Sequence, residues 1–268
     1  MINNKIKQNK EMVVHLYANC WNERKILPFV VDYWSKWVTK AFVYDNGSTD
    51  GSVEFLQQFD WIEVRELVSE GFDDITIAEM KNTAWVDNID GVDYIVCCDI
   101  DECIWHPSME KVLERFKRDR VGYARPQWLE MTSLEFPEYK EGKLLHEQCP
   151  LCTKINDPIF QKACVFDPHI VENMNYGVGS HYCHPTFHHP ERGCCIDDMS
   201  LYLLHCKQLN VDYILNRYDA LKQRLSERNK KYNWGCHYMS DKTIIESNFY
   251  AFHQKAIDIK NYIVDHEK

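Results

Sequence analysis

The chain has 268 residues, of which 45% are hydrophobic and 13% aromatic, and its formal net charge is −10 at pH 7. This composition supports a sizeable hydrophobic core and excludes a disordered, collagen-like or coiled-coil chain. The excess of acidic residues also argues against a protein that binds nucleic acid without regard to sequence. We expect one α/β domain over residues 1–268, because α/β domains of this size are often undivided.

Targeting and redox signals point to one compartment. No stretch approaches the roughly 18 apolar residues of a membrane span, and the first ten residues lack the apolar centre of a signal peptide. The twelve cysteines include the adjacent pairs Cys97-Cys98 and Cys194-Cys195, which is more typical of reduced core residues than of a disulfide scaffold. We therefore expect a cytoplasmic protein.

Short apolar runs in the first hundred residues predict four strands, at 12–17, 40–45, 61–65 and 93–98, of which the first is buried. The spacing of apolar residues between them predicts helices at about 23–38, 50–59 and 74–85, with a sharp turn at Asn46-Gly47. Strands that alternate with helices form right-handed crossovers, so we expect a parallel sheet covered on both faces. Ligands of such sheets bind beyond the carboxyl ends of the strands.

The regular alternation of strands and helices ends after Ser108. We expect Ser108 to begin a helix that ends near Lys117. Beyond it the sequence predicts strands at 121–128, 159–166 and 201–205 and a helical stretch at 210–232. We interpret this half as a mixed extension of the same sheet, followed by C-terminal helices.

Two carboxylates, Asp99 and Asp101, follow directly after the fourth predicted strand. Like charges this close are costly unless a cation lies between them or water reaches them. Mg²⁺ or Mn²⁺ held by one or two carboxylates and by phosphate oxygens is a usual way to bind a diphosphate. The pattern therefore predicts a divalent metal site here.

Further segments accompany this acidic pair in a recognisable order: a strand ending at Asn22-Glu23, then Tyr44-Asp-Asn-Gly-Ser-Thr-Asp50-Gly-Ser52, Lys81-Asn82-Thr-Ala84, and Tyr94 to Glu102. With them, residues 12–105 resemble glycosyltransferase family 2 and its relatives, nucleotide-sugar transferases of the GT-A fold. The resemblance implies that residues 12–105 bind a nucleotide sugar and that residues 106–268 bind the acceptor.

The resemblance also implies roles for single residues. Asp99 and Asp101 would bind the metal, and the nucleotide sugar would contact Tyr17, Ala18, Glu23, Asp45, Asn46, Lys81 and Asp99. Family members frequently have two acids where this chain has Asp45 followed by Asn46. Because an amide both donates and accepts hydrogen bonds, uracil, thymine and guanine all stay open. We expect a UDP-sugar first, with GDP- and dTDP-sugars as alternatives.

An inverting transferase needs a base that takes the proton of the acceptor hydroxyl. In this family a carboxylate well downstream of the metal motif commonly does this, and Asp197 and Asp198 stand at that distance. We favour Asp198 slightly; the alternative is a turn or helix start before Met199-Ser-Leu-Tyr.

A late histidine often completes the metal site in GT-A enzymes. His205, at the end of the apolar run 201–204, is our first candidate, and His181 is the second. The alternative for each is a hydrogen-bonded loop residue.

Other interpretations remain open at this stage. Cys149, Cys152, Cys183-His184 and Cys194-Cys195 could form a zinc site, which would make the chain a non-catalytic binding module. A sugar-phosphate nucleotidyltransferase has a similar sheet, but it requires a glycine-rich loop after the first strand, and Asn19-Cys-Trp-Asn22 has no glycine. The basic residues Lys222, Arg224, Arg228, Lys230 and Lys231 suit either an anionic lipid surface or a solvated helix face.

The sequence thus predicts a metal-dependent glycosyltransferase, which we expect to be inverting. It would move a sugar from a nucleoside diphosphate to a hydroxyl of a glycan or lipid-linked acceptor. Its cofactor would be Mn²⁺ or Mg²⁺, and contact with a membrane would be peripheral.

Overall fold

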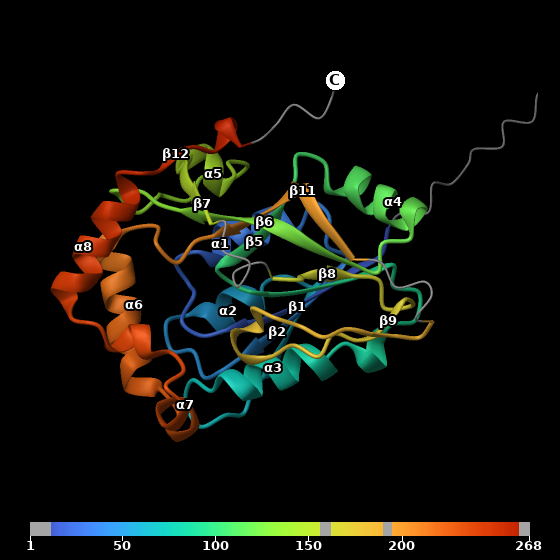
Figure 1. Ribbon diagram of the computed structural model, residues 1–268, viewed down its shortest axis with the longest axis horizontal. Coiled ribbons are helices and arrows are strands. Elements are labelled where there is room, and N and C mark those ends of the chain that lie inside the picture. The colour runs from blue at the N-terminus through green and yellow to red at the C-terminus, as the bar shows by residue number, and fades with distance from the viewer. Residues whose placement is uncertain (1–11, 156–161, 190–194, 263–268) are drawn as a thin grey trace, which may run out of the picture.

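The structure is a computed structural model, and it describes residues 12–155, 162–189 and 195–262 (Figure 1). Asp197 and Met199 are described by their backbone alone. The element bounds below refer to these ranges.

The first half forms a parallel sheet, as predicted. Its strands are β1 (Val14–Cys20), β2 (Lys40–Asp45), β3 (Ile62–Glu66) and β4 (Tyr94–Asp99), which pair in the order β4-β1-β2-β3. The connecting helices are α1 (Leu27–Trp34), α2 (Ser52–Leu56) and α3 (Asp74–Thr83). The chain therefore has a Rossmann-like α/β core.

Both faces of β1 are buried, which is why its sequence is almost continuously apolar. Val14, Leu16 and Ala18 belong to the larger hydrophobic cluster, which includes the buried residues of α1. Tyr17 points into a second cluster on the opposite face, with Phe42 and Trp85. The alternation of side chains along a strand places neighbouring residues in different layers.

The second half extends the sheet with strands of both directions. They are β5 (Glu102–Trp105), β6 (Tyr123–Met131), β7 (Leu151–Lys154), β8 (Val165–Phe166), β11 (Cys195–His205) and β12 (Ile257–Asp258). The full order is β12-β7-β6-β8-β4-β1-β2-β3, and β11 pairs with β5 and β6. A separate hairpin consists of β9 (Val171–Asn173) and β10 (Thr186–Phe187). This confirms a mixed extension of the parallel half.

The directions of these strands decide where the functional side chains gather. β8 is antiparallel to both β4 and β6, so β6 runs parallel to β4, and β11 is parallel to β6. The carboxyl ends of β1, β2, β3, β4, β6 and β11 therefore lie at one edge of the sheet.

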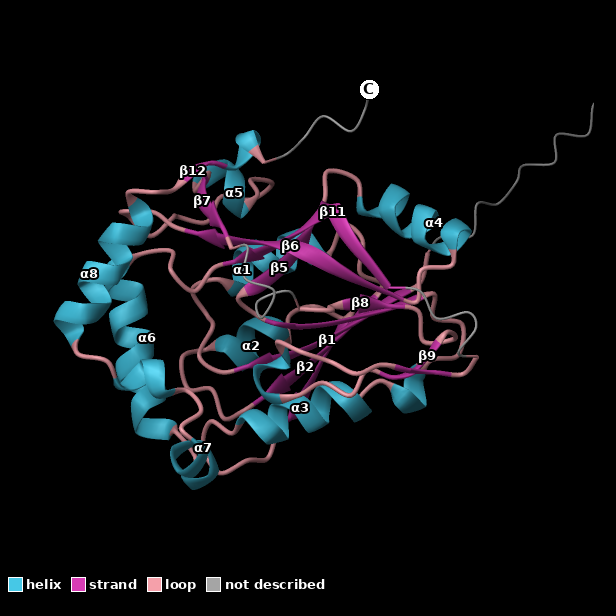
Figure 2. Cartoon of the chain, in the orientation of Figure 1, coloured by secondary structure: helices cyan, strands magenta, loops and turns pink. Residues whose placement is uncertain are grey.

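The remaining helices are α4 (Met109–Asp119), α5 (Leu145–Gln148), α6 (Val211–Arg224), α7 (Glu227–Tyr232) and α8 (Lys242–His253). Figure 2 shows α6, α7 and α8 together on one side of the molecule and α4 on the other. Side chains of α6 contact Asp101 and Asn46, so this helix lies across the carboxyl edge of the sheet.

Several predicted bounds differ from the observed ones. The helical stretch 210–232 is two helices, because Leu225 has an extended backbone (ψ 124°) and Ser226 caps α7. The strand expected at 201–205 begins earlier, at Cys195, and the helix expected at 23–38 covers only 27–34. Of the strand expected at 159–166, β8 is the part that is observed; residues 159–161 lie outside the described ranges.

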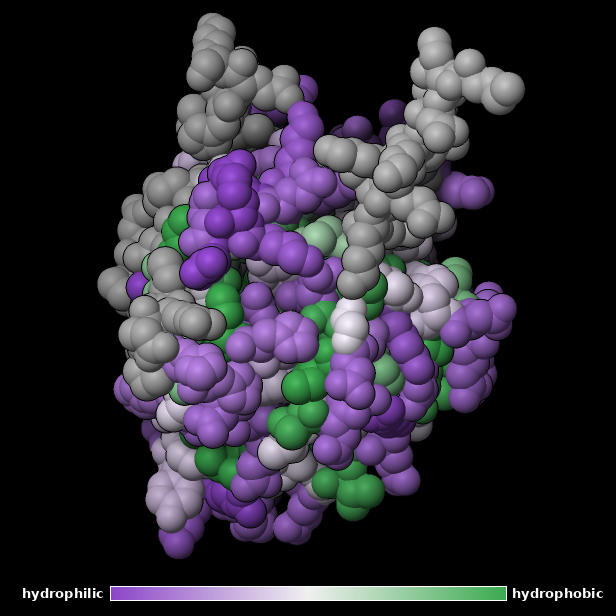
Figure 3. All heavy atoms as spheres, turned by 90° about the vertical axis from the view of Figure 1, so that its right-hand side faces the viewer, coloured by the Kyte–Doolittle hydropathy of each residue, from purple (hydrophilic) through white to green (hydrophobic). Residues whose placement is uncertain are grey.

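The described helices are all shorter than a membrane span. The longest, α6, has 14 residues, and none in the described ranges combines the length and apolar character needed to cross a bilayer. On the face at the α4 side, hydrophilic residues predominate and hydrophobic ones lie between them (Figure 3). Such a mixture is usual for a surface in contact with water.

Candidate functional site

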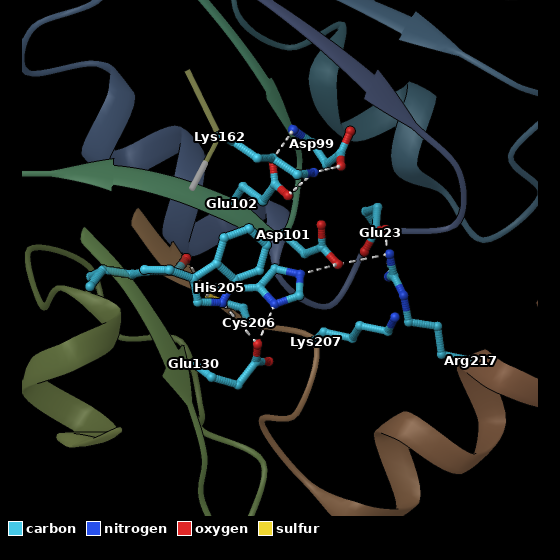
Figure 4. Close-up of polar contacts among 12 residues, drawn as sticks. Glu23, Asp99, Asp101, Glu102, Glu130, Lys162, His205, Cys206, Lys207 and Arg217 are labelled. Carbon is cyan, nitrogen blue, oxygen red and sulfur yellow. Dashed lines mark hydrogen bonds and ion pairs between the residues drawn. The ribbon is translucent and has the colours of Figure 1, made fainter. Parts of the chain in front are cut away.

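Acidic side chains from several strands meet at the carboxyl edge of the sheet (Figure 4). Asp99 ends β4, and Asp101 and Glu102 follow at the turn into β5. The strand register sets Glu102 of β5 and Glu130 of β6 on either side of His205. Glu23 joins them from the segment after β1. The topology thus brings together residues that are far apart in the sequence.

Two lysines neutralise Asp99. Lys81 Nζ of α3 lies 2.6 Å from its Oδ1, and Lys162 Nζ lies 3.0 Å from its Oδ2 and also contacts Glu102. Burial alone would favour the neutral acid, but Lys162 and Lys81 hold the pKa of Asp99 well below its ordinary value. Asp99 keeps 27% of its side chain exposed, whereas both lysines are buried.

Asp101 has different partners. Its Oδ2 lies 3.1 Å from Nη2 of Arg217 and 3.8 Å from Nε2 of His205. Burial opposes ionisation, but Arg217 and His205 lower the pKa of Asp101. Arg217 also lies 2.5 Å from Glu23, whose pKa burial nevertheless raises to about 7. One arginine of α6 therefore holds two acids that lie after different strands.

His205 is oriented by a carboxylate. Its Nδ1 lies 2.6 Å from Oε2 of Glu130, and the same oxygen accepts a hydrogen bond from Trp128 Nε1 at 3.2 Å. A carboxylate only accepts hydrogen bonds, so Nδ1 is the donor and Nε2 is the nitrogen on the Asp101 side. A ring nitrogen fixed by a carboxylate is the usual arrangement of a metal-binding histidine.

Asp101 and His205 can provide part of the ligand set of a divalent ion. Among the residues that the structure describes, no group of three or more His, Cys, Asp or Glu side chains is arranged to hold a metal. Asp101 and His205 would supply two ligands, and Mg²⁺ or Mn²⁺ commonly takes the others from phosphate oxygens and water. The donor set therefore suits an ion that binds together with a diphosphate.

His181, the second candidate ligand, follows the short turn Val178–Ser180 and also borders the site. Its ring centroid lies 6.1 Å from that of Trp128, and the His205 ring lies 4.7 Å from the same indole. Burial lowers the pKa of His181 to about 3, so its imidazole is neutral.

A cavity of about 470 Å³ opens at the ends of β2 and β3. Asp45, Asn46 and Gly47 line one side, and its other walls include Arg65, Leu67, Ser69 and Arg224. Oδ2 of Asp45 accepts hydrogen bonds from the backbone N–H groups of Gly47 and Ser48, which forms the predicted turn. The predicted nucleotide residues Asp45 and Asn46 thus lie at a cavity that a nucleoside could enter.

Tyr17 and Ala18, two other predicted nucleotide contacts, lie in the core. Both are fully buried, and the Tyr17 ring stacks on Phe42 with centroids 4.8 Å apart. The reason is that β1 continues to Cys20, so these residues belong to the strand and not to the loop after it.

The predicted base, Asp198, is not brought to the site. It lies in the first half of β11, where it contacts Arg115 of α4 and accepts hydrogen bonds from Ser200. The register shifts between Asp198 and Tyr202, so Asp198 pairs with Pro126 and His205 with Glu130. These positions are four residues apart on β6, which is about 13 Å at roughly 3.3 Å per residue. Asp197 pairs through its backbone with Arg125 in the same region, and its side chain lies outside the described part.

Of the cysteines proposed for zinc, Cys149 and Cys152 are core residues, whereas Cys183 is partly buried and Cys195 is exposed. Cys149 and Cys152 are buried, and burial raises the pKa of the Cys152 thiol to about 12, which disfavours the thiolate that binds zinc. Burial likewise raises the pKa of Cys183 to about 11. Cys194 lies outside the described residues.

Sequence reasoning missed four residues of the site: Lys162, Glu130, Arg217 and Arg224. A signal existed for the arginines, because Tyr213, Arg217 and Arg224 recur at spacings of four and seven and so share a helix face. The sequence pattern places Arg224 on a basic helix face that is either lipid-facing or solvated. Arg224 instead contacts Asn46, and Arg228 lies 3.5 Å from Asp73.

Comparison with known proteins gives only distant structural similarity. No family model and no curated protein matches the sequence. The chain is similar to the crystal structure of S. aureus TarS 1-349, with a TM-score of 0.43 and 9% identity over 82% of this chain and 68% of that one. A second crystal structure of S. aureus TarS gives a TM-score of 0.37 and 11% identity over 93% of this chain and 45% of that one. Both TM-scores lie below 0.5, so function is inferred from the site residues.

Proposed function

We propose that this chain is a metal-dependent glycosyltransferase that takes a sugar from a nucleoside diphosphate. The observation that carries the proposal is the group Asp101, His205 and Glu130 at the edge of the sheet where the nucleoside-sized cavity also opens. Ligands of parallel α/β sheets bind at this edge.

Helix α6 contacts both the cavity and the carboxylates. Arg224 lines the cavity and Arg217 contacts Asp101, so the same helix borders both. At about 1.5 Å per residue they are separated by about 10 Å along the helix. A ribose and a diphosphate can cover that span, so one donor would reach both places.

Asp101 and His205 would hold Mn²⁺ or Mg²⁺. When bound there, the ion would neutralise the diphosphate as it leaves the sugar. Asp99, which the sequence predicts as a metal ligand, is instead paired with Lys81 and Lys162. It is more exposed than Asp101 and would accept hydrogen bonds from donor hydroxyls. Arg217 adds a positive charge at the same edge.

The acceptor in this proposal is a hydroxyl of a glycan or lipid-linked molecule, bound by residues 106–268, and the expected stereochemistry is inversion. Asp198 has no part in it, because its carboxylate is paired with Arg115 in the first half of β11.

The test is an Asp101→Asn variant assayed with UDP-, GDP- and dTDP-sugars and Mn²⁺, with slow donor hydrolysis as the readout when the acceptor is unknown. Wild type should turn over one donor class. The variant should lose about a hundredfold or more, because an amide replaces a charged ligand near the leaving group.

Asp198→Asn is the matched control. It also removes a buried carboxylate, but this one lies in the first half of β11, away from Asp101. It should keep turnover close to that of wild type. Full activity of the Asp101 variant, or activity that persists in a chelator, would contradict the proposal.

A further inference from the structure

Asn46 is fully engaged in hydrogen bonds within the protein. Its Nδ2 donates to the carbonyl oxygen of Leu67 and to Oγ of Ser69, both at 2.8 Å. Its Oδ1 and its backbone oxygen accept from Nη2 of Arg224, at 3.0 and 2.8 Å. The amide at position 46 therefore positions Arg224, and its own hydrogen-bonding groups are already used.

Arg224 is also fixed by the aromatic ring and the backbone around it. Its guanidinium carbon lies 4.1 Å from the centroid of Trp21. Its backbone oxygen accepts from Phe72 N at 2.7 Å, and Phe72 O accepts from Ser226 N at 3.0 Å. A Cβ at Gly71 would lie 2.1 Å from the Arg224 oxygen, so only glycine permits this approach. The guanidinium thus reaches the cavity from a rigid base.

Two polar atoms of the cavity walls have no hydrogen-bond partner within the described part of the chain, although their side chains attract each other by charge. They are Nη1 of Arg224, a donor, and Oδ1 of Asp45, an acceptor, and both are shielded from water. Buried polar atoms normally have partners, because an unmade hydrogen bond costs free energy. A ligand that offers one acceptor and one donor would satisfy both.

We propose that Arg224 is the residue that determines the base of the nucleotide donor. Arg224 Nη1 donates to a carbonyl oxygen of the base, and Asp45 Oδ1 accepts the ring N–H beside that carbonyl. Uracil, thymine and guanine carry this N–H and carbonyl pair. Cytosine and adenine have an unprotonated ring nitrogen in its place, which would face the carboxylate. The inference rests on the proposed function and adds the residue of α6 that sets its base class.

The test compares the binding of UDP, GDP, dTDP, CDP and ADP by calorimetry, with Mn²⁺ present, in wild type and in Arg224→Met and Arg224→Lys. Lys222→Met is the matched control, because Lys222 is an exposed cation on the same helical turn. All five ligands share the diphosphate, so the ratio of affinities isolates the base.

Wild type should prefer at least one of UDP, GDP and dTDP to CDP and ADP. Arg224→Met should reduce that preference about tenfold or more, the usual effect of deleting a charged hydrogen-bond donor. Arg224→Lys should lose most of it too, because a single ammonium cannot contact both Asn46 oxygens and the base. Lys222→Met should keep the wild-type ratio.

The outcomes separate this inference from the proposed function. If wild type binds one base class and Arg224→Met keeps the same ratio, the role of Arg224 is overturned while donor binding stands. An equal loss for all five ligands would also overturn it, since a supporting role weakens every nucleotide alike. If wild type binds none of the five, both proposals fall.

Discussion

At Lys162, one buried ammonium group contacts two carboxylates, Asp99 at 3.0 Å and Glu102. The side chain of Lys162 is 5% exposed and that of Glu102 is 1% exposed. Desolvation of three charges is costly, and the cost is offset only while every charge keeps its partner. Removal of the lysine would leave Glu102 without its cation.

We therefore expect Lys162→Met to lower the free energy of unfolding by about 3–5 kcal/mol, the usual range for breaking a buried pair. Urea denaturation at neutral pH measures the loss. Lys40→Met is the control, because Lys40 and Glu63 form a pair in which both side chains are about 40% exposed. Such a pair contributes about 0–1 kcal/mol. Equal losses in the two variants would contradict this account of Lys162.

Asp101 could be predicted from the sequence and Lys162 could not, because one depends on a local pattern and the other on a tertiary contact. Asp99 and Asp101 follow an apolar strand directly, so a local pattern places them at the edge of a sheet. Lys162 is a single lysine before a short apolar run, and its contact with Asp99 arises only because β8 pairs with β4. Asp198 was chosen by its distance along the sequence, which does not contain its contact with Arg115 of α4 in the first half of β11.

At the scale of elements, the segment before α3 and the end of α6 are joined by the backbone at Gly71 and Phe72. Two backbone hydrogen bonds join them: Phe72 N donates to Arg224 O, and Ser226 N donates to Phe72 O. Gly71 has a φ of +69° and no room for a Cβ. The end of α6, and with it Arg224, depends on this glycine.

Gly71→Ala should therefore displace the end of α6 and weaken nucleotide binding as well as lower stability. Gly91→Ala is the matched control, since Gly91 also has a positive φ (+74°) but nothing within 4 Å of its Cβ position. A left-handed alanine alone costs about 1–2 kcal/mol. Thermal unfolding and nucleotide calorimetry should show a larger stability loss for Gly71→Ala and a binding loss for that variant alone. Identical behaviour of the two would show that the close approach does not matter.

The elements themselves were predicted well where the chain alternates strand and helix. β1, β2 and β4 are largely buried on both faces, so each appears as an apolar run bounded by polar turns. β3 is the end strand of the sheet and has only Ile62 buried, and its apolar and polar residues alternate instead. The break between α6 and α7 was missed because the helical pattern continues through Leu225, whose extended backbone is set by the contact with Phe72. Tertiary contacts, which a local pattern does not contain, decide such boundaries.

For the whole molecule, the distribution of charge differs from the net charge. The chain carries −10 overall, yet Lys81, Lys162, Arg217 and Arg224 all lie at the carboxyl edge of the sheet. The first three are paired with Glu23, Asp99, Asp101 and Glu102 at the same edge. In the proposed function, the divalent ion would therefore supply the positive charge that a diphosphate needs here.

Stability as a function of pH is a property of the whole fold to which His146 of α5 contributes. Its ring lies 4.4 Å from that of Trp105, and burial lowers the pKa of His146 to about 4. An unfolded histidine has its pKa near 6.5. Between these values the unfolded chain binds a proton that the folded chain does not, so stability falls as the pH decreases from about 6.5 to about 4.

His146→Gln removes this titration. Wild type should lose stability on going from pH 7.5 to pH 5, and the variant should lose less, by on the order of 1 kcal/mol after allowance for the partial exposure of the ring. Urea midpoints at the two pH values measure the difference. Other groups titrate equally in both proteins, so they cancel in the comparison, and the exposed His188→Gln serves as a control that should follow wild type. A His146 variant as sensitive to acid as wild type would show that protonation of this histidine does not oppose folding.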